Sequence, residues 1–326
     1  MKLKVEEETD PACGKPPKER TVEELVELGF AVMDKPAGPS SHEVDAFARK
    51  ILGARKSGHA GTLDPNVTGV LPVAFNSATK ALGFLLARSQ KEYVGIIQFH
   101  REVAGEDVRK AFKCFTGDIT QLPPLRSAVR RRERKRKVYY LEPLEYLGSE
   151  VLFLVGCEAG TYVRKLCFDM GRFLGCGANM LELRRTRVGP ITEQSAVTLQ
   201  DLTDAVWLWK ERGDEREMRR CLHPIEDAVA LKRIALRDSA VDAVCMGAQL
   251  RMPGIARLDE GISAGETVAL MTLKGELVAV AEAAAGSGAL LREGKGEAAK
   301  TLRVIMKAGT YPRMWKTKAD EPAKVS

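Results

Sequence analysis

Residues 58–65 read Gly58-His59-Ala60-Gly61-Thr62-Leu63-Asp64-Pro65, a glycine-rich turn that carries one carboxylate just before an apolar run. The glycines permit backbone conformations and close approaches that larger residues do not. Pro65 fixes its own φ and keeps the backbone of Asp64 extended rather than helical. An Asp-Pro pair in such a turn is most often only a turn, in which Asp bonds its own backbone. A carboxylate held rigidly beside core residues is also suited to catalysis. Only the motifs in the rest of the chain can distinguish a structural turn from a catalytic carboxylate.

Length and composition narrow the class of protein. A chain of 326 residues predicts two domains, and 44% hydrophobic residues are enough to bury a full core. No apolar run approaches the length of a membrane span, and the first twenty residues lack the apolar segment of a signal peptide. We therefore expect a cytoplasmic protein with no membrane partner. The seven cysteines are scattered without a Cys-x-x-Cys pair, which indicates neither a zinc knuckle nor a disulfide framework.

Positive charge is concentrated in one segment. The formal net charge is +7, and residues 126–137 alone contain eight basic side chains against one acidic side chain. The eight are Arg126, Arg130, Arg131, Arg132, Arg134, Lys135, Arg136 and Lys137. A solvated charge run is the common explanation of such a cluster. This density instead favours a polyanion partner, whose phosphates the segment would neutralise in a salt-dependent way.

The first 230 residues alternate predicted strands and helices, with no internal repeat. Strand patterns cover 30–34, 91–99, 138–141, 151–155 and 181–190. Helix patterns cover 42–52, 78–87, 108–115 and 199–212, and a further helix follows Gly160 and ends near Leu174. Thr21 with Glu24 resembles a capping box for a short helix that ends at Leu28. Ser41 is predicted to cap the helix from His42, which has Val44, Phe47, Ala48 and Ile51 on one face.

Composition shifts near Pro224. From Leu231 on, short β-rich segments alternate with glycine turns, at 248–251, 267–272, 277–282 and 303–307, and predict a small β-barrel-like domain. The Ala- and Gly-rich stretch 283–300 predicts a short helix and loops. Residues 1–20 mix Lys, Glu and Pro, which predicts a poorly ordered arm.

Five motifs together resemble those of the TruB-type pseudouridine synthases, in the order of that family. They are Lys35-Pro36 with Gly38 and Ser40-Ser41-His42, the opening turn, Lys91-Glu92-Tyr93, Gly160-Thr161-Tyr162-Val163-Arg164, and Glu182-Leu183-Arg184-Arg185-Thr186-Arg187-Val188-Gly189-Pro190. Any one motif would be weak, but five in order are specific. The length, the basic segment and Met246-Gly247-Ala248 with Pro253-Gly254-Ile255 resemble the archaeal and eukaryotic branch. That branch, which includes dyskerin, supplies the catalytic subunits of box H/ACA guide-RNA particles.

The resemblance covers about residues 20–315 and implies an α+β fold. We expect a mixed, largely antiparallel sheet with flanking helices, followed by a small β-barrel-like PUA domain. The implied organisation is a flexible arm over 1–20, a pseudouridine synthase domain over 21–230, a PUA-like RNA-binding domain over 231–315 and a flexible tail over 316–326. An archaeal source is favoured, because long Lys-rich tails are absent; a eukaryotic protein would be nucleolar.

The resemblance implies isomerisation of uridine to pseudouridine in RNA, with Asp64 as the essential aspartate. Whether the carboxylate attacks the sugar, attacks the base or abstracts a proton on the way to a glycal stays open. Desolvation by Val67, Val70 and Leu71 would raise its pKa, whereas a cation nearby would lower the pKa by about one to three units. Arg164, which matches the family's arginine, is the expected partner. We predict that the pairing dominates and that Asp64 is anionic.

Other residues receive roles from the resemblance alone. Tyr93 is expected to stack on the target base, with Tyr162 lining the pocket, and His59 is expected to contact RNA. Lys35 and Lys91 are either buried supports or phosphate contacts. The basic segment corresponds to a thumb loop that folds over bound RNA, and Gly247 and Ala248 are expected to contact guide RNA in the PUA-like domain.

The expected partners are box H/ACA guide RNA, substrate RNA and the small accessory proteins of the particle, without metal or cofactor. A stand-alone synthase acting on transfer RNA is the near alternative. A non-catalytic RNA scaffold for ribosome assembly is the alternative from a different class, and the presence of Asp64, Tyr93 and Arg164 argues against it.

Overall fold

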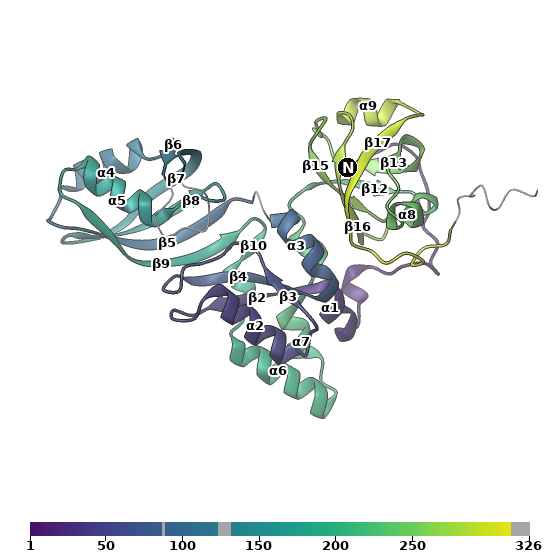
Figure 1. Ribbon diagram of the computed structural model, residues 1–326, viewed down its shortest axis with the longest axis horizontal. Coiled ribbons are helices and arrows are strands. Elements are labelled where there is room, and N and C mark those ends of the chain that lie inside the picture. Colours follow the sequence, from purple (N-terminus) through teal and green to yellow (C-terminus); the bar gives the residue numbers. More distant parts are fainter. Residues whose placement is uncertain (87–88, 123–131, 314–326) are drawn as a thin grey trace, which may run out of the picture. The chain divides into compact units, whose positions relative to one another are not determined.

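The computed structural model describes residues 1–86, 89–122 and 132–313, and divides the chain into two compact units (Figure 1). We call them the Asp64 unit, formed by Ala31–Ala74 and Leu86–Leu222, and the C-terminal unit, formed by Met1–Phe30, Phe75–Leu85 and His223–Ser326. Within the described ranges, no helix combines the length and the apolar character that crossing a membrane requires.

The Asp64 unit is built on one mixed sheet with the strand order β2-β4-β9-β5-β8-β7-β6, which the short β11 (Leu222–Pro224) precedes beside β2; β3 adds beside β4 and β10 beside β9. β4 and β9 pair in parallel, whereas β5 to β9 otherwise pair antiparallel. This confirms the predicted mixed, largely antiparallel sheet. The strands are β2 (Gly29–Lys35), β3 (Ser57–His59), β4 (Thr68–Phe75), β5 (Lys91–Phe99), β6 (Gly117–Gln121), β7 (Arg134–Leu147), β8 (Glu150–Cys157), β9 (Ala178–Val188) and β10 (Ile191–Thr192).

Helices flank this sheet, with α4 and α5 over the region of β5 to β9 and α2 beside α6 (Figure 1). They are α2 (Ser41–Leu52), α4 (Gly105–Cys114), α5 (Val163–Phe173), α6 (Leu199–Arg212) and α7 (Arg216–Cys221). The prediction that Ser41 caps α2 is wrong, because Ser40 forms the capping box with Glu43 and Ser41 is the first helical residue. Phe47, predicted on the buried face, is exposed.

Strand β5 has one buried face and one partly exposed face. Its alternate residues Lys91, Tyr93, Gly95, Ile97 and Phe99 are buried, while the residues between them are only partly covered. Two polar side chains therefore share a face with two of the large apolar ones. Tyr93, Ile97 and Phe99 join one hydrophobic core cluster.

The C-terminal unit contains a seven-stranded sheet with the order β1-β14-β12-β15-β16-β17-β13, in which β12 and β15 pair in parallel. The strands are β1 (Lys2–Leu3), β12 (Lys232–Leu236), β13 (Leu250–Arg251), β14 (Ile255–Leu258), β15 (Thr267–Met271), β16 (Leu277–Ala283) and β17 (Glu297–Val304). The helices are α1 (Val22–Leu28), α3 (Thr79–Leu86), α8 (Asp238–Cys245) and α9 (Ser287–Arg292). The sequence patterns predicted neither α8 nor the start of β17 inside 283–300.

The N-terminal segment differs from the expected flexible arm. Lys2 and Leu3 form the edge strand β1 beside β14. The Thr9 hydroxyl and the Asp10 N–H donate to the buried Asp238 carboxylate at 2.9 and 2.8 Å. The Lys274 ammonium donates to the Asp10 carbonyl at 2.9 Å. Polar groups of Thr9 and Asp10 are thus partners of polar groups in the rest of the C-terminal unit.

The ion pair between Arg20 and Glu226 is buried inside the C-terminal unit. Arg20 donates two hydrogen bonds to Glu226, of 2.6 and 2.8 Å, and both side chains are buried. The Glu226 carboxylate also accepts the Leu277 N–H at 2.8 Å. A buried pair of this kind is costly to break, because the remaining charge keeps its desolvation penalty without its partner.

We predict that Arg20→Ala lowers the free energy of unfolding by about 3–5 kcal/mol, because it leaves Glu226 buried and uncompensated. Urea unfolding measures this change. Lys2→Ala is the control, since Lys2 and Glu260 form an exposed pair at 3.4 Å; its removal should cost less than about 1 kcal/mol. Equal losses in the two variants would contradict the assignment of a buried stabilising pair.

Candidate active site

The turn that carries Asp64 is fixed on its N-terminal side by Ser41. The buried Ser41 hydroxyl accepts the Leu63 N–H at 2.8 Å and donates to the Leu63 carbonyl at 3.1 Å. This hydroxyl is available because Ser40, not Ser41, caps α2. The residue directly before Asp64 is therefore held through both of its backbone polar groups.

Lys35 fixes the other side of the turn. Its ammonium donates to the carbonyls of Pro36, Pro65 and Val67 at 2.8, 2.7 and 3.0 Å. The Gly38 N–H also donates to the Pro65 carbonyl, at 3.1 Å. Lys35 is completely buried and burial lowers its pKa. Of the two roles open from the sequence, the structure favours the buried support, because all three contacts are to the protein's own backbone.

Arg185 connects the turn to the sheet. Its guanidinium is completely buried and donates from Nε to the Val70 carbonyl at 2.7 Å and from Nη2 to the Gly61 carbonyl at 2.8 Å. Gly61 has a φ of +78°, and a Cβ there would lie 3.2 Å from both Arg185 Nη1 and Lys91 Cε. Gly61 is thus required both by its backbone conformation and by the close approach of these cations.

The site role of Arg185 was missed from the sequence, although a signal for it exists. Arg185 lies two residues after the buried Leu183 in β9, so strand alternation places it on the core face. Its neighbours on the strand behave differently: Arg184 pairs with Asp34 at 2.9 Å, and Arg187 pairs with Glu92 at 3.2 Å. Of the three arginines at 184, 185 and 187 in β9, Arg185 is therefore the buried one that supports the turn.

Lys91 lies beside Arg185 and is also buried. Burial, together with the positive charge of Arg185, lowers the pKa of Lys91 to about 8. Its ammonium lies 3.5 Å from the Ser89 carbonyl. The structure therefore favours the support role for Lys91 as well.

Asp64 and Arg164 meet as predicted, with Arg164 Nη2 donating to Asp64 Oδ2. The two side chains are 54% and 58% exposed, so the predicted desolvation of Asp64 by Val67, Val70 and Leu71 is wrong. Those three side chains point into the core while the carboxylate points outward. An exposed pair stabilises a fold by at most about 1 kcal/mol. The pairing therefore orients the carboxylate rather than stabilising the unit.

Arg164 is presented by the first turn of α5. Gly160, with a φ of +83°, precedes that turn, and Tyr162 is the N-cap residue without a side-chain cap. The Tyr162 backbone is instead held by the side chain of Gln121, at the end of β6. No sequence pattern marked Gln121.

The two aromatic candidates differ in exposure. Tyr93 is only 7% exposed and packs in the core cluster that includes Leu63 and Val67, on either side of Asp64. Burial raises the pKa of the Tyr93 phenol. Tyr162 is half-buried. Base stacking by Tyr93 and pocket lining by Tyr162 stay predictions.

His59 lies in β3 against helix α2. Its side chain is buried, its ring meets the edge of His42 with centroids 4.7 Å apart, and Nδ1 lies 3.8 Å from Asp45 Oδ2. The predicted RNA contact of His59 is untested by this arrangement. In the described ranges, no cluster of three or more His, Cys, Asp or Glu side chains could hold a metal ion.

The basic segment is divided by the structure. Arg126, Arg130 and Arg131 lie outside the described residues, and Arg132 is exposed. Arg134 to Lys137 are not loop residues as predicted: they begin β7, where they pair with β6 from Gln121 to Asp118. The exposed Lys135 and Lys137 alternate with the half-buried Arg134 and Arg136. The Arg136 guanidinium packs against Gly160: a Cβ built on this glycine would lie 3.1–3.5 Å from the guanidinium atoms.

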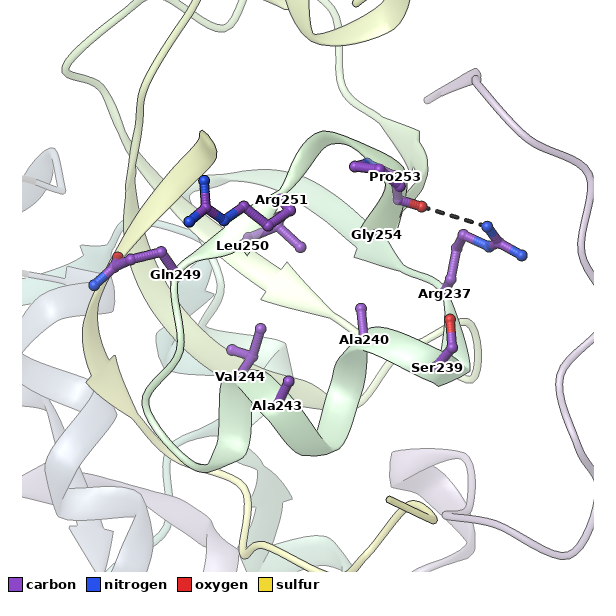
Figure 2. Close-up of a pocket in the computed structure, with 10 residues that line it drawn as sticks. All are labelled: Arg237, Ser239, Ala240, Ala243, Val244, Gln249, Leu250, Arg251, Pro253 and Gly254. Atoms are coloured by element: carbon purple, nitrogen blue, oxygen red, sulfur yellow. Dashed lines mark hydrogen bonds between the residues drawn. The ribbon is translucent and has the colours of Figure 1, made fainter. Parts of the chain in front are cut away.

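A separate cavity of about 210 Å³ opens in the C-terminal unit, between α8 and the segment that follows it (Figure 2). Its floor is apolar, with Ala240, Ala243 and Leu250, and Arg237 and Arg251 lie at its edge. The predicted RNA-contact residues Gly247 and Ala248 immediately precede its lining residue Gln249. Gly247 has a φ of +92° and Ala248 is exposed.

The fold and the site together define a class: a pseudouridine synthase fold with a C-terminal PUA domain. Four family models match consecutive parts of the chain. They are the DKCLD (NUC011) domain at residues 1–45, the TruB family pseudouridylate synthase N-terminal domain at 49–163, the tRNA pseudouridylate synthase B C-terminal domain at 164–230 and the PUA domain at 232–305.

Curated relatives and solved structures agree with these matches. The chain is 54% identical to a "Probable tRNA pseudouridine synthase B" of Methanosarcina barkeri, covering 95% of this chain and 92% of that protein. It is 48% identical, with a TM-score of 0.92 and 95% coverage of both chains, to a chain in "Crystal Structure of a Cbf5-Nop10-Gar1 Complex". It is 46% identical, with a TM-score of 0.90 and 96% coverage of both, to a chain in "Structure of H/ACA RNP bound to a substrate RNA containing 2'-deoxyuridine". The chain belongs to the TruB family of pseudouridine synthases, which isomerise uridine in RNA.

We predict a specific pH dependence from Lys91. Its pKa is about 8 in the folded chain against an ordinary 10.5, so between these values the unfolded chain binds more protons and stability rises with pH. Relative to Lys91→Met, the free energy of unfolding of the wild type should rise by up to about 1.4 kcal/mol per pH unit in that window. Urea unfolding at several pH values from 7 to 10.5 measures it. A flat or falling difference would contradict the burial of this cation.

Proposed function

We propose that this chain isomerises uridine to pseudouridine as the catalytic subunit of a box H/ACA guide-RNA particle, with Asp64 as the catalytic carboxylate. The observation that carries the chemistry is the Asp64–Arg164 pair on a turn fixed by Lys35, Ser41 and Arg185. The guide-dependent part of the proposal is supported by the likeness over nearly the whole chain to subunits of H/ACA complexes.

The reaction breaks the bond between N1 of the base and C1′ of the ribose, and forms a bond from C5 to C1′. The proton on C5 moves to solvent and N1 gains one, so that no atom is added or lost. An ionised carboxylate serves each of the three routes left open by the sequence: attack on the sugar, attack on the base, or abstraction of a sugar proton. Arg164 favours that ionised form, because a guanidinium stays charged and grips a carboxylate.

The exposure of Asp64 suits a substrate that enters from outside. A uridine reaches the carboxylate only when taken out of its stack, which costs a few kcal/mol. A bound nucleotide would cover the pair, and its electrostatic interactions would strengthen as water is excluded. The backbone beneath it is already fixed, so little reorganisation is needed at that moment.

RNA contacts are proposed at two places. The exposed cations Arg132, Lys135 and Lys137 are free of buried supporting roles and are suited to phosphates. In the C-terminal unit, the cavity edged by Arg237 and Arg251 is suited to RNA, with Gly247 and Ala248 beside it. We propose the cytoplasm of an archaeal-type cell as the place of action, since RNA is the substrate.

The name of the curated relatives favours a second candidate, action on transfer RNA without a guide. One experiment separates the two. The chain is incubated with free transfer RNA, or with a target paired to an H/ACA guide in the presence of the accessory proteins of such a particle, and pseudouridine is mapped by mass spectrometry. Product on the guided target alone supports the proposal, and product on transfer RNA alone replaces it.

We predict that Asp64→Ala lowers the rate of isomerisation by about 10³-fold or more, because it removes the carboxylate on which each of the three routes depends. Unfolding and RNA affinity should be nearly unchanged, since the pair is exposed and its removal costs little. Single-turnover kinetics with saturating RNA measure the rate. Retained isomerisation would remove Asp64 from the mechanism.

We also predict that replacing Arg132, Lys135 and Lys137 together by Gln flattens the salt dependence of RNA binding. Each lost phosphate contact should reduce the slope of log affinity against log salt by about 0.7–0.9. Filter binding between 50 and 400 mM KCl measures the slope. A matched triple change at Lys80, Lys110 and Lys113, which lie in other exposed positions, should leave the slope as it is. An unchanged slope in the first variant would count against these contacts.

A further inference from the structure

We propose that Gln121 is a positioning residue that couples the basic hairpin of β6 and β7 to the Asp64–Arg164 pair. The inference deepens the proposed function, because it assigns a task to the hairpin beyond holding RNA. Gln121 neither touches the reacting carboxylate nor carries charge. Its effect is exerted through the backbone that presents Arg164.

The contact is a reciprocal pair of hydrogen bonds. Gln121 Nε2 donates to the Tyr162 carbonyl at 3.1 Å, and the Tyr162 N–H donates to Gln121 Oε1 at 3.0 Å. The Gln121 side chain is buried, so both of its amide atoms depend on this partner. Because donor and acceptor are used together, only a primary amide of this length reproduces the pair at neutral pH.

Gln121 is the last residue of β6 and pairs across the hairpin with Arg134, the first residue of β7. Two further contacts tie β7 to the segment before α5. The Lys137 N–H donates to the Glu158 carboxylate at 3.2 Å, and the Glu158 N–H donates to the Lys137 carbonyl at 2.8 Å. Strands β6 and β7, which carry the cations, are thus hydrogen-bonded to both ends of the segment 158–162.

That segment determines where Arg164 lies. Arg164 is in the first turn of α5, where a cation is disfavoured by the helix dipole. Its side chain is more than half exposed, so few packing contacts restrain it. Its position therefore depends on Asp64 and on the backbone two residues earlier, at Tyr162, which Gln121 holds.

The consequence is a mechanical link from RNA binding to catalytic geometry. A displacement of the hairpin by phosphates on its cations moves Gln121, and with it the N-terminus of α5 and the guanidinium on Asp64. Removing the link leaves the cations in place, and should therefore reduce the rate of chemistry more than the affinity for RNA.

The test compares Gln121→Met, similar in length but without the hydrogen bonds, with Thr120→Val, a change at the exposed neighbour on β6. In single-turnover assays at saturating RNA, Gln121→Met should lower the rate by about 10- to 100-fold. The Kd for RNA should change less than about twofold, which corresponds to 0.4 kcal/mol. Thr120→Val should retain both. A wild-type rate in Gln121→Met, or an equal loss of affinity and rate, would overturn the inference.

Gln121→Glu supplies a readout that a merely structural role would not move. The introduced carboxyl reproduces the donor to the Tyr162 carbonyl only when protonated, so the rate of this variant relative to wild type should recover as pH falls from 8 to 5. This variant also covers the case in which Gln121→Met fails to fold. A pH-independent ratio would contradict the positioning role.

Hydrogen exchange separates this inference from the proposed function. In the wild type, binding of the target RNA should slow amide exchange in a peptide spanning 160–166, and in Gln121→Met it should not, whether or not product forms. If the wild type forms no pseudouridine but shows this difference in exchange from Gln121→Met, only the proposed function is contradicted. If the wild type is active and the exchange of the two proteins responds equally to RNA, only the coupling is contradicted.

Discussion

The geometry of the site depends on the buried guanidinium of Arg185. A charge taken out of water is costly unless its donors are met, and here they are met by the Val70 and Gly61 carbonyls. Those two carbonyls belong to β4 and to the turn before Asp64, while Arg185 itself belongs to β9. Moving the turn would remove the Gly61 acceptor and leave Nη2 of the buried guanidinium without it, so the desolvation penalty of Arg185 favours one position of the turn. Gly61 is the corresponding requirement on the turn, since a side chain there would meet Arg185 and Lys91.

The reactive groups on this rigid turn are exposed to solvent. Lys35 and Ser41 hold the residues on either side of Asp64 through their backbone, yet the carboxylate and its partner Arg164 are both more than half exposed. The hydrogen bonds that fix the turn come from the buried side chains of Lys35, Ser41 and Arg185. Ordering the carboxylate therefore does not require burying it, and an incoming nucleotide can supply the desolvation.

Two groups of cations in the Asp64 unit differ in burial and in their partners. Lys35, Lys91 and Arg185 are buried and act on the protein's own carbonyls or packing. Lys135 and Lys137 are exposed on a hairpin strand and are available to a polyanion. Because β6 and β7 hold the segment before α5 as well, the available cations and the catalytic pair share one hydrogen-bonded framework.

The sequence by itself determined the family, the mixed sheet and the helix α6 from Leu199 to Arg212, because motifs, periodicity and caps are local properties of the chain. The partnership of Asp64 with Arg164, which are 100 residues apart, was predicted from the resemblance to the family rather than from a local pattern. The sequence left Lys35 and Lys91 equally open to a role as buried supports or as phosphate contacts. It indicated a desolvated Asp64 and a flexible arm over residues 1–20, and it marked neither Arg185 nor Gln121 as a site residue. Only the tertiary structure decided these points. Burial and the partner of a polar group are set by segments far apart in the chain, such as β9 on the turn at Gly61 or β6 on Tyr162, and no local pattern of residues records such a meeting.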